Sequence, residues 1–263
     1  PANAERDALP SVWPLAAKHG FRTDAPPLNF AARLGHFAFD SGTPLMAGSW
    51  AAARGGAACA LAAAQAVLGG ERFAMALTRP PGHHAGPNYM GGYCFINNAA
   101  VAAQALRDGG LQRVAVLDVD YHHGNGTQTC FYERSDVLTV SIHGDPRTEY
   151  PFFLGHADER GTGAGEGFNL NLPLPRGSGF DAWSAALEVA LARIAIEWVA
   201  ASAHVTDRLL LKEAGALDLL VVLEGLQPDP VARALEGPLE ENAAWARAWF
   251  AGHARPWSAA IRA

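Results

Sequence analysis

The chain has 263 residues, of which 49% are hydrophobic and 17% charged, and its net charge is -6. This length suits one large α/β domain, and the ordinary apolar fraction excludes a wholly disordered chain. The excess of acidic residues argues against a protein that binds nucleic acid mainly through phosphate contacts, so we expect no nucleic-acid partner.

The most apolar segment of the sequence covers residues 51–68 and is rich in alanine. A membrane-spanning helix needs roughly 18 uninterrupted apolar residues. Arg54, Gly55, Gly56 and Gln65 interrupt this segment, so we expect a helix that does not enter a membrane. Since no charged start precedes an apolar run near Pro1, we also expect no signal peptide.

The cysteines indicate the compartment. Cys59, Cys94 and Cys130 form an odd set without a C-x-x-C pair. Free thiols in a reducing compartment are the simplest interpretation of such a set. We therefore expect a cytoplasmic protein.

The first half of the chain predicts two helices and a strand. Residues 51–68 favour a helix that ends at Gly69 and Gly70. The short apolar run 73–77 predicts a buried strand, followed by a loop rich in proline and glycine. A second helix is expected over 97–107, with Asn97 or Asn98 as its N-cap.

The second half predicts further strands and helices in alternation. Apolar runs at 114–117, 137–142 and 217–223 predict buried strands, and helices are expected over 180–201, 207–214 and 239–250. Continuous apolar strands that alternate with helices indicate a mostly parallel sheet covered by helices on both faces. Since no linker interrupts the pattern, we expect a single domain over residues 1–263.

Polar residues follow three of these strands. They form the segments Arg79-Pro80-Pro81-Gly82-His83-His84, Asp118-Val119-Asp120-Tyr121-His122-His123-Gly124-Asn125-Gly126 and Ser141-Ile142-His143-Gly144-Asp145. In open parallel sheets, ligands bind outside the carboxyl ends of the strands. The three segments therefore predict one polar site.

Residue spacing indicates the chemistry of this site. On an extended segment, Asp118, Asp120 and His122 would share one side. A carboxylate and an imidazole on one side are suitable ligands for a metal such as Zn²⁺. His83 or His84, at the neighbouring strand end, could act as a general base beside a metal-bound water.

The linked motifs resemble those of the zinc-dependent histone deacetylase superfamily. They are Arg79-Pro80-Pro81-Gly82-His83-His84-Ala85, Gly91-Gly92-Tyr93-Cys94-Phe95, Asn97-Asn98-Ala99, residues 117–128, Val140-Ser141-Ile142-His143 and Gly163-Ala164-Gly165-Glu166-Gly167, with Asn169 and Asn171-Leu172-Pro173. Within the superfamily the chain is most similar to bacterial acetylpolyamine amidohydrolases and class II-like deacetylases. The resemblance implies an arginase/deacetylase-like fold of three layers and removal of acetyl groups from acetylpolyamines or acetyl-lysine.

The resemblance also implies residue roles. Asp120 and His122 match two of three zinc ligands, and His84 and His83 match the general base and its electrostatic partner. By the same resemblance, Asp118 would orient His83, and Asn125 would orient His84. The resemblance also implies a K⁺ site formed by Asp118, Asp120, His122, Ser141 and Ile142. The implied substrate tunnel is lined by Gly92, Tyr93 and Tyr150. Many relatives form homodimers, and the same is expected here by resemblance.

Two residues of the family pattern have no evident match. These are the third zinc ligand, an aspartate, and the tyrosine that binds the developing oxyanion. The segment 219–230 can be matched either to the family strand that precedes the aspartate or to the strand that precedes the tyrosine, and we prefer the second match. In both matches, Gln227 stands where the family has the functional residue. Conceivable substitute ligands are Asp207, Glu224 and Asp229.

The chain is also short against the family pattern. We expect the family domain to be incomplete before Pro10 and after about residue 195, by about one strand–helix unit. Two hypotheses follow. The chain is a zinc-dependent deacetylase, or it is a catalytically impaired homologue or incomplete chain that binds metal or ligand weakly.

Overall fold

A computed structural model describes residues 9–10, 25, 27–71, 73–201 and 220–222. The chain divides into two compact units, Pro1–Glu224 and Gly225–Ala263, and every described residue belongs to the first. The expectation of one domain over residues 1–263 therefore stays a prediction. The expected helices 207–214 and 239–250 lie outside the described residues, as do Asp207, Glu224, Gln227 and Asp229.

The described residues contain a sheet of four strands in the order β3-β2-β1-β4. They are β1 (Val114–Asp118), β2 (Val137–Gly144), β3 (Asn169–Leu174) and β4 (Leu220–Val222), and every pairing is parallel. The register sets Asp118 at the end of β1 beside Ser141 of β2. Parallel pairing thus brings the carboxyl ends of the strands, with their polar loops, to one edge of the sheet.

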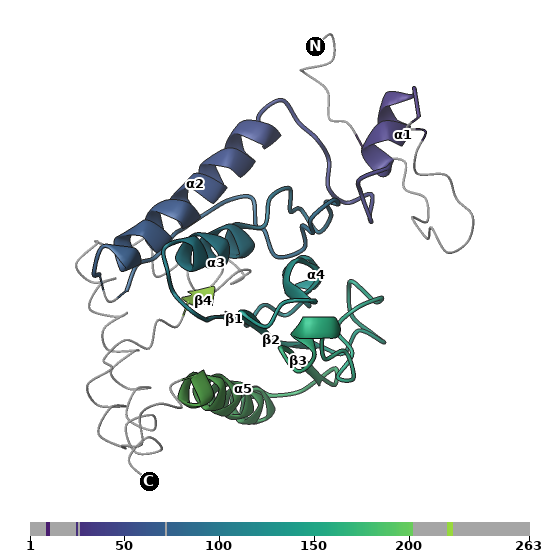
Figure 1. Cartoon of the computed structure of the whole chain (residues 1–263). Helices are drawn as coiled ribbons and strands as arrows, with labels where there is room; N and C mark the ends of the chain where they lie inside the picture. The colour runs from purple at the N-terminus through teal and green to yellow at the C-terminus, as the bar shows by residue number, and fades with distance from the viewer. Residues whose placement is uncertain (1–8, 11–24, 26, 72, 202–219, 223–263) are drawn as a thin grey trace, which may run out of the picture. The chain divides into compact units, whose positions relative to one another are not determined.

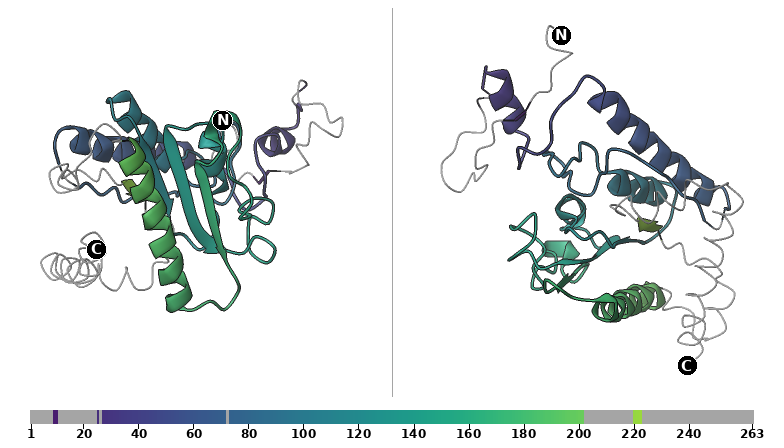
Figure 2. Two further views of the ribbon diagram at one scale, coloured as in Figure 1. Left: turned by 60° about the horizontal axis from the view of Figure 1, so that its bottom comes forward. Right: turned by 180° about the vertical axis from the view of Figure 1, so that it is seen from behind.

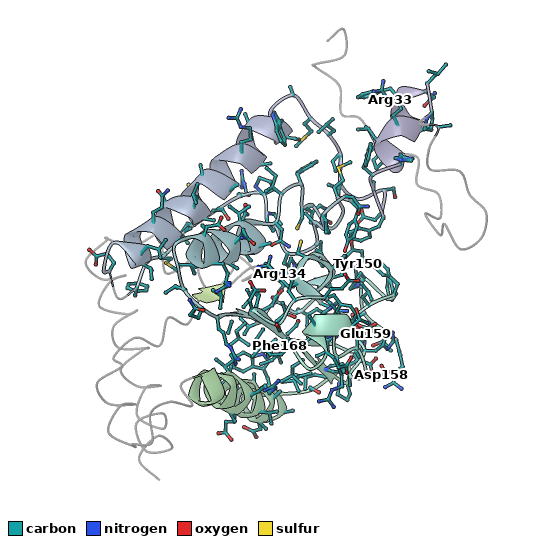
Figure 3. All side chains as sticks on the ribbon, viewed as in Figure 1. Arg33, Arg134, Tyr150, Asp158, Glu159 and Phe168 are labelled. Atoms are coloured by element: carbon teal, nitrogen blue, oxygen red, sulfur yellow. The ribbon has the colours of Figure 1, made fainter. Side chains whose placement is uncertain are left out.

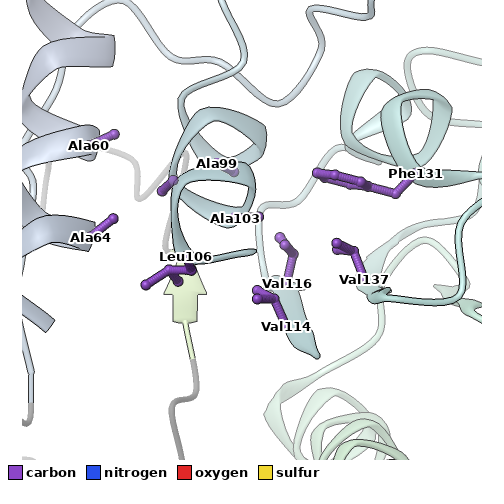
Figure 4. Packing of buried hydrophobic residues seen from close by; sticks show 10 residues of the cluster. Ala60, Ala64, Ala99, Ala103, Leu106, Val114, Val116, Phe131 and Val137 are labelled. Atoms are coloured by element: carbon purple, nitrogen blue, oxygen red, sulfur yellow. The ribbon is translucent and has the colours of Figure 1, made fainter. Parts of the chain in front are cut away.

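Helices cover both faces of this sheet (Figures 1 and 2). On one face, Val114 and Val116 of β1 pack with residues of α3 (Asn98–Asp108), and α2 (Ser49–Leu68) packs outside α3 (Figure 4). On the other face, Ala115 and Leu117 pack with α5 (Phe180–Ala201). Since alternate residues of a strand point to opposite faces, one apolar run serves both cores. The predicted parallel sheet with helices on both faces is confirmed.

Helix α3 begins where the sequence predicted, and its N-cap is Asn97. The Asn97 Oδ1 atom accepts a hydrogen bond from the backbone N–H of Ala100, 2.9 Å away. The Nδ2 atom of the same side chain donates to the Ala85 carbonyl and to Thr127 Oγ1, at 3.0 and 3.1 Å. One buried amide therefore starts the helix and ties it to the segment that follows His84.

The predicted buried strand at 73–77 is wrong. The segment is not a strand, and Phe73, Met75 and Leu77 are 73%, 64% and 70% exposed. No strand among the described residues pairs with it. A five-residue apolar run shows only that a segment can be buried, because burial also needs a neighbour that covers it.

The sequence patterns did not predict α1 (Phe30–Gly35), α4 (Asn125–Phe131), the short 3₁₀ helix η2 (Gly163–Gly165) or β3. Helix α4 starts in a Gly-Asn-Gly segment, which is typical of a turn. Strand β3 contains Pro173, which lacks a backbone N–H. Because β3 is the last strand on its side of the sheet that the described residues form, the proline is tolerated there.

Helix α2 is long and apolar enough to span a membrane by length and composition, with a mean hydropathy of 1.3. A core helix of a soluble protein passes the same test, so one such helix is weak evidence. In the structure its buried side packs on α3 through small residues such as Ala60 and Ala64. The absence of a membrane partner stays a prediction.

Replacement of Asn97 by alanine is expected to lower the free energy of unfolding by about 2–3 kcal/mol, because it removes a helix cap and leaves buried polar groups unpaired. The matched control is Asn29→Ala. Asn29 caps α1 through a hydrogen bond from Ala32, but the bond is exposed. This control should lose less than about 1 kcal/mol. Urea unfolding measures both, and equal losses would show that the additional bonds of Asn97 contribute nothing.

Candidate active site

The carboxylate of Asp118 organises the end of β1. Its Oδ2 atom lies 2.9 Å from His83 Nδ1, and its Oδ1 atom accepts a hydrogen bond from the backbone N–H of Asp120 at 3.0 Å. Both Asp118 and His83 are buried. The structure therefore brings Asp118 to the histidine that the family resemblance assigns to it.

His84 has a defined tautomer. Its Nδ1 atom lies 2.7 Å from Asn125 Oδ1, while Asn125 Nδ2 faces the His84 carbonyl and the hydroxyl of Tyr89. With the amide in this orientation, Nδ1 carries the proton and donates it to the oxygen, so Nε2 keeps a free lone pair. Burial, and then the neighbouring His83, lowers the pKa of His84 from 6.5 to about 3. His84 is thus neutral at pH 7.

The two predicted metal ligands lie close to the histidine pair. The rings of His83 and His84 are 4.0 Å apart between centroids, and the ring of His122 lies 6.3 Å from that of His84. Asp120 Oδ1 is 3.5 Å from His122 Nδ1. Burial would raise the pKa of Asp120, but hydrogen bonds from His122 and the nearby His83 outweigh it, and the pKa is lowered. Asp120 is therefore an ionised, available ligand.

The backbone conformation that brings Asp120 and His122 together differs from the predicted extended segment. Strand β1 ends at Asp118, and the chain then bends instead of continuing as an extended segment. The Asp120 backbone N–H donates to Asp118, and the His122 backbone N–H donates to Asp120 Oδ1 at 2.6 Å. These successive turns, typical of aspartate, place Asp120 and His122 together without regular alternation.

The donor types at Asp120 and His122 fit Zn²⁺, which takes carboxylate oxygen and imidazole nitrogen. The number of donors does not yet fit, because a catalytic zinc site has three protein ligands. Among the described residues, no group of three histidine, cysteine, aspartate or glutamate side chains could hold a metal ion. The described part of the chain therefore brings together the two predicted zinc ligands.

Two of the residues expected at a K⁺ site, Asp118 and Ser141, lie on the neighbouring strands β1 and β2. Asp118 and Ser141 are register neighbours and line a small cavity. The hydroxyl of Ser141 is hydrogen-bonded to His143 Nδ1 at 2.8 Å, and His143 Nε2 donates to the Gly155 carbonyl at 2.9 Å. The Ser141 side chain is thus engaged with His143, and a potassium ion at this place stays a prediction.

The three expected tunnel residues lie at different depths. The ring of Tyr150 meets those of His84 and His122 edge to face, with centroids 5.1 and 5.7 Å apart. Gly92 has φ +54°, and a Cβ atom there would lie 2.1 Å from His84 Cδ2. The side chain of Tyr93 is 67% exposed. Gly92 and Tyr150 thus border the histidines, whereas Tyr93 lies at the surface.

Sequence reasoning missed Phe39 and Asp40. The ring of Phe39 lies 6.4 Å from His84 and 5.9 Å from Tyr150 between centroids. Asp40 accepts a hydrogen bond from the hydroxyl of Tyr150 at 2.6 Å. The sequence Asp40-Ser41-Gly42-Thr43 is typical of an aspartate turn, but it carries no sign of a contact with a residue 110 positions away.

The free cysteines agree with the sequence prediction. Cys59 is exposed, Cys94 is buried and Cys130 is partly buried, and none forms a disulfide. Burial raises the pKa of Cys130 to about 11. This thiol is therefore protonated at neutral pH and is a poor nucleophile.

Comparisons with known proteins agree with the resemblance. The model of the histone deacetylase domain matches residues 16–205. Two acetylpolyamine amidohydrolases of Pseudomonas aeruginosa are 61% identical over 175 residues and 54% identical over 188 residues, which are 66% and 72% of this chain. They are similar over only 51% and 54% of their own length. The chain therefore spans about half the length of the curated relatives it matches.

A solved structure with a similar fold is an acetylpolyamine aminohydrolase from Burkholderia pseudomallei, with 44% identity and a TM-score of 0.66. The match covers 73% of this chain and 54% of that one. A homologue of histone deacetylases from Aquifex aeolicus matches 61% of this chain and 42% of its own, with 33% identity and a TM-score of 0.55. The predicted family and fold are confirmed.

Replacement of Gly92 by alanine is expected to lower the free energy of unfolding by about 1–3 kcal/mol more than the matched change Gly110→Ala, because a crowded side chain forces its neighbours to shift. Both glycines have positive φ, at +54° and +102°, but a Cβ atom at Gly110 meets nothing within 4 Å. Gly110→Ala thus measures backbone strain alone. Chemical unfolding gives both values, and equal losses would contradict the close approach of Gly92 to His84.

Proposed function

Because the chain belongs to the histone deacetylase family, we propose that it hydrolyses the amide bond of acetylated polyamines and releases acetate. The observation that carries the proposal is His84, a buried neutral imidazole whose Nδ1 is held by Asn125 at 2.7 Å. Its remaining nitrogen can accept a proton, and the ligands Asp120 and His122 lie beside it.

His84 Nε2 accepts a proton from the attacking water as the oxygen forms a bond to the amide carbon. When the carbon–nitrogen bond breaks, His84 returns the proton to the amine, and acetate and the free amine are the products. Asp118 fixes the ring of His83 through Nδ1, which makes His83 the electrostatic partner in the pair. A Zn²⁺ ion held by Asp120 and His122 would supply Lewis-acid activation of the carbonyl.

The aromatic residues around the histidines support a cationic substrate with an extended arm. Phe39 and Tyr150 lie against His84, and the exposed rings of Tyr93 and Phe152 lie farther out. Aromatic faces attract ammonium groups, which polyamines carry along their length. The two relatives from Pseudomonas aeruginosa are named for acetylpolyamines. We therefore propose acetylpolyamines, ahead of acetyl-lysine, as the substrates.

One observation favours the second hypothesis, a catalytically impaired homologue. The described residues hold no group of three side chains that could bind a metal. Two protein ligands hold zinc less firmly than three, and such a chain would bind metal weakly. A homodimer, a K⁺ ion and a cytoplasmic location complete the proposal, and they rest on the family resemblance and the composition.

We expect His84→Ala to lower the rate of acetate release from N-acetylputrescine by at least about 100-fold, the usual contribution of a general base. The matched control is His36→Ala, since His36 lies at the C-terminal end of α1. Acetate release by the metal-loaded protein measures both variants. A wild-type chain that turns over neither N-acetylputrescine nor an acetyl-lysine peptide would instead support the impaired homologue.

Metal binding gives an independent test. We expect about one Zn²⁺ per chain after dialysis, as for a catalytic site. Asp120→Ala and His122→Ala should each abolish stoichiometric binding, whereas Asp158→Asn, a change of an exposed aspartate, should not. Elemental analysis of the dialysed proteins measures the stoichiometry. Loss of zinc from the wild type in mild chelator would favour the impaired homologue.

A further inference from the structure

Asp40 lies between α1 and α2 and joins three loops around the histidine pair. Its Oδ1 atom accepts hydrogen bonds from the Gly42 backbone N–H and from Thr43 Oγ1, both at 3.1 Å. Its Oδ2 atom accepts from the Gly92 backbone N–H at 2.8 Å and from the Tyr150 hydroxyl at 2.6 Å. One carboxylate thus receives four hydrogen bonds, two from its own turn and two from segments far away in the sequence.

The bond to Tyr150 fixes an aromatic ring against the site. Tyr150 lies edge to face with both His84 and His122, and Figure 3 labels its position. Burial, and then the hydrogen bond to Asp40, raises the pKa of Tyr150 well above its usual value. The phenol therefore stays protonated and remains a donor to the carboxylate.

The bonds to Gly92 and Thr43 fix a second segment that lies close to His84. Gly92 and Tyr93 both have positive φ, at +54° and +66°, and an L-residue such as Tyr93 adopts this conformation only when its surroundings hold it. The Tyr93 backbone N–H donates to Thr43 Oγ1 at 2.9 Å, and Thr43 in turn donates to Asp40. Asp40 therefore holds the turn at Gly92 directly and the turn at Tyr93 through Thr43.

We propose that Asp40 is a positioning residue that fixes the surroundings of His84 by holding both Tyr150 and the Gly92–Tyr93 turn. It acts through these neighbours and is not assigned a contact with substrate. The inference deepens the proposed function, and its kinetic part rests on that function. The position of the Tyr150 ring, however, can be measured without any turnover.

The first experiment uses the ring currents of Tyr150. In the metal-free protein with ¹³C-labelled histidine, Tyr150→Leu removes the ring and defines the largest displacement of the His84 and His122 signals. Asp40→Asn should move both signals in the same direction, because a neutral amide with one acceptor oxygen replaces the charged carboxylate, whose two oxygens accept all four hydrogen bonds. Asp158→Asn, an exposed aspartate labelled in Figure 3, removes the same charge and should leave them in place.

A second variant guards against misfolding of Asp40→Asn. Tyr150→Phe keeps the ring and removes only the hydroxyl, so it breaks the same bond from the other side. The double variant should displace the signals no further than the single variant with the larger displacement. The reason is that both substitutions act on the same hydrogen bond, between Tyr150 and Asp40. Unchanged signals in folded Asp40→Asn and Tyr150→Phe, or additive displacements in the double variant, would overturn the proposal.

The kinetic experiment uses N-acetylputrescine. Asp40→Asn and Tyr150→Phe should each lower kcat/KM about tenfold, and the double variant should be no worse than the single ones, as expected for residues in one hydrogen-bond network. Asp158→Asn should keep the wild-type value. If the wild type shows no turnover, the proposed function fails, and the histidine signals alone decide the role of Asp40.

Discussion

The buried carboxylate of Asp118 is the contact on which the rest of the site depends. A buried charge is costly unless it is hydrogen-bonded, and Asp118 meets this condition with His83 on one oxygen and the backbone of Asp120 on the other. The same bonds end strand β1 and turn the chain toward His122. A Cβ atom at Gly124 would lie 2.2 Å from Asp118 Oδ2, so only glycine lets the chain pass this close. One carboxylate thus fixes both a histidine and the course of the loop that carries the predicted metal ligands.

Strand β2 shows how a fully buried strand can serve a core and a site together. Leu138, Val140 and Ile142 pack in the cluster with α5. Of the alternate residues, Thr139 donates to Asn169 at 2.6 Å and Ser141 is hydrogen-bonded to His143 at 2.8 Å. All of these residues are buried, so the polar groups need partners within the protein. The two-residue period of the strand therefore separates an apolar face from a polar network that supports the loops around the site.

The sequence patterns predicted those features that short segments determine. The apolar strands β1 and β2, the cap of α3 and the extent of α5 depend on neighbouring residues, and the structure contains all of them. The segment 73–77 failed because burial depends on what covers it, and α4 was missed because its start reads as a turn. Pairwise site contacts such as His84 with Asn125 came from the family resemblance. The contact of Asp40 with Tyr150 spans 110 positions and has no local signal.

The proposed zinc site divides into a part that the described residues contain and a part that they do not. The orientation of Asp120 and His122 is local, since the backbone N–H of His122 bonds to Asp120 Oδ1 within a two-residue turn. Asn125 in α4 and Asp118 in β1 likewise position the histidine pair from within the described sheet. Among the described residues no third suitable side chain joins Asp120 and His122, so firm metal binding at the proposed site needs a ligand from another segment. The residues proposed to transfer protons, in contrast, all lie within residues 83–125.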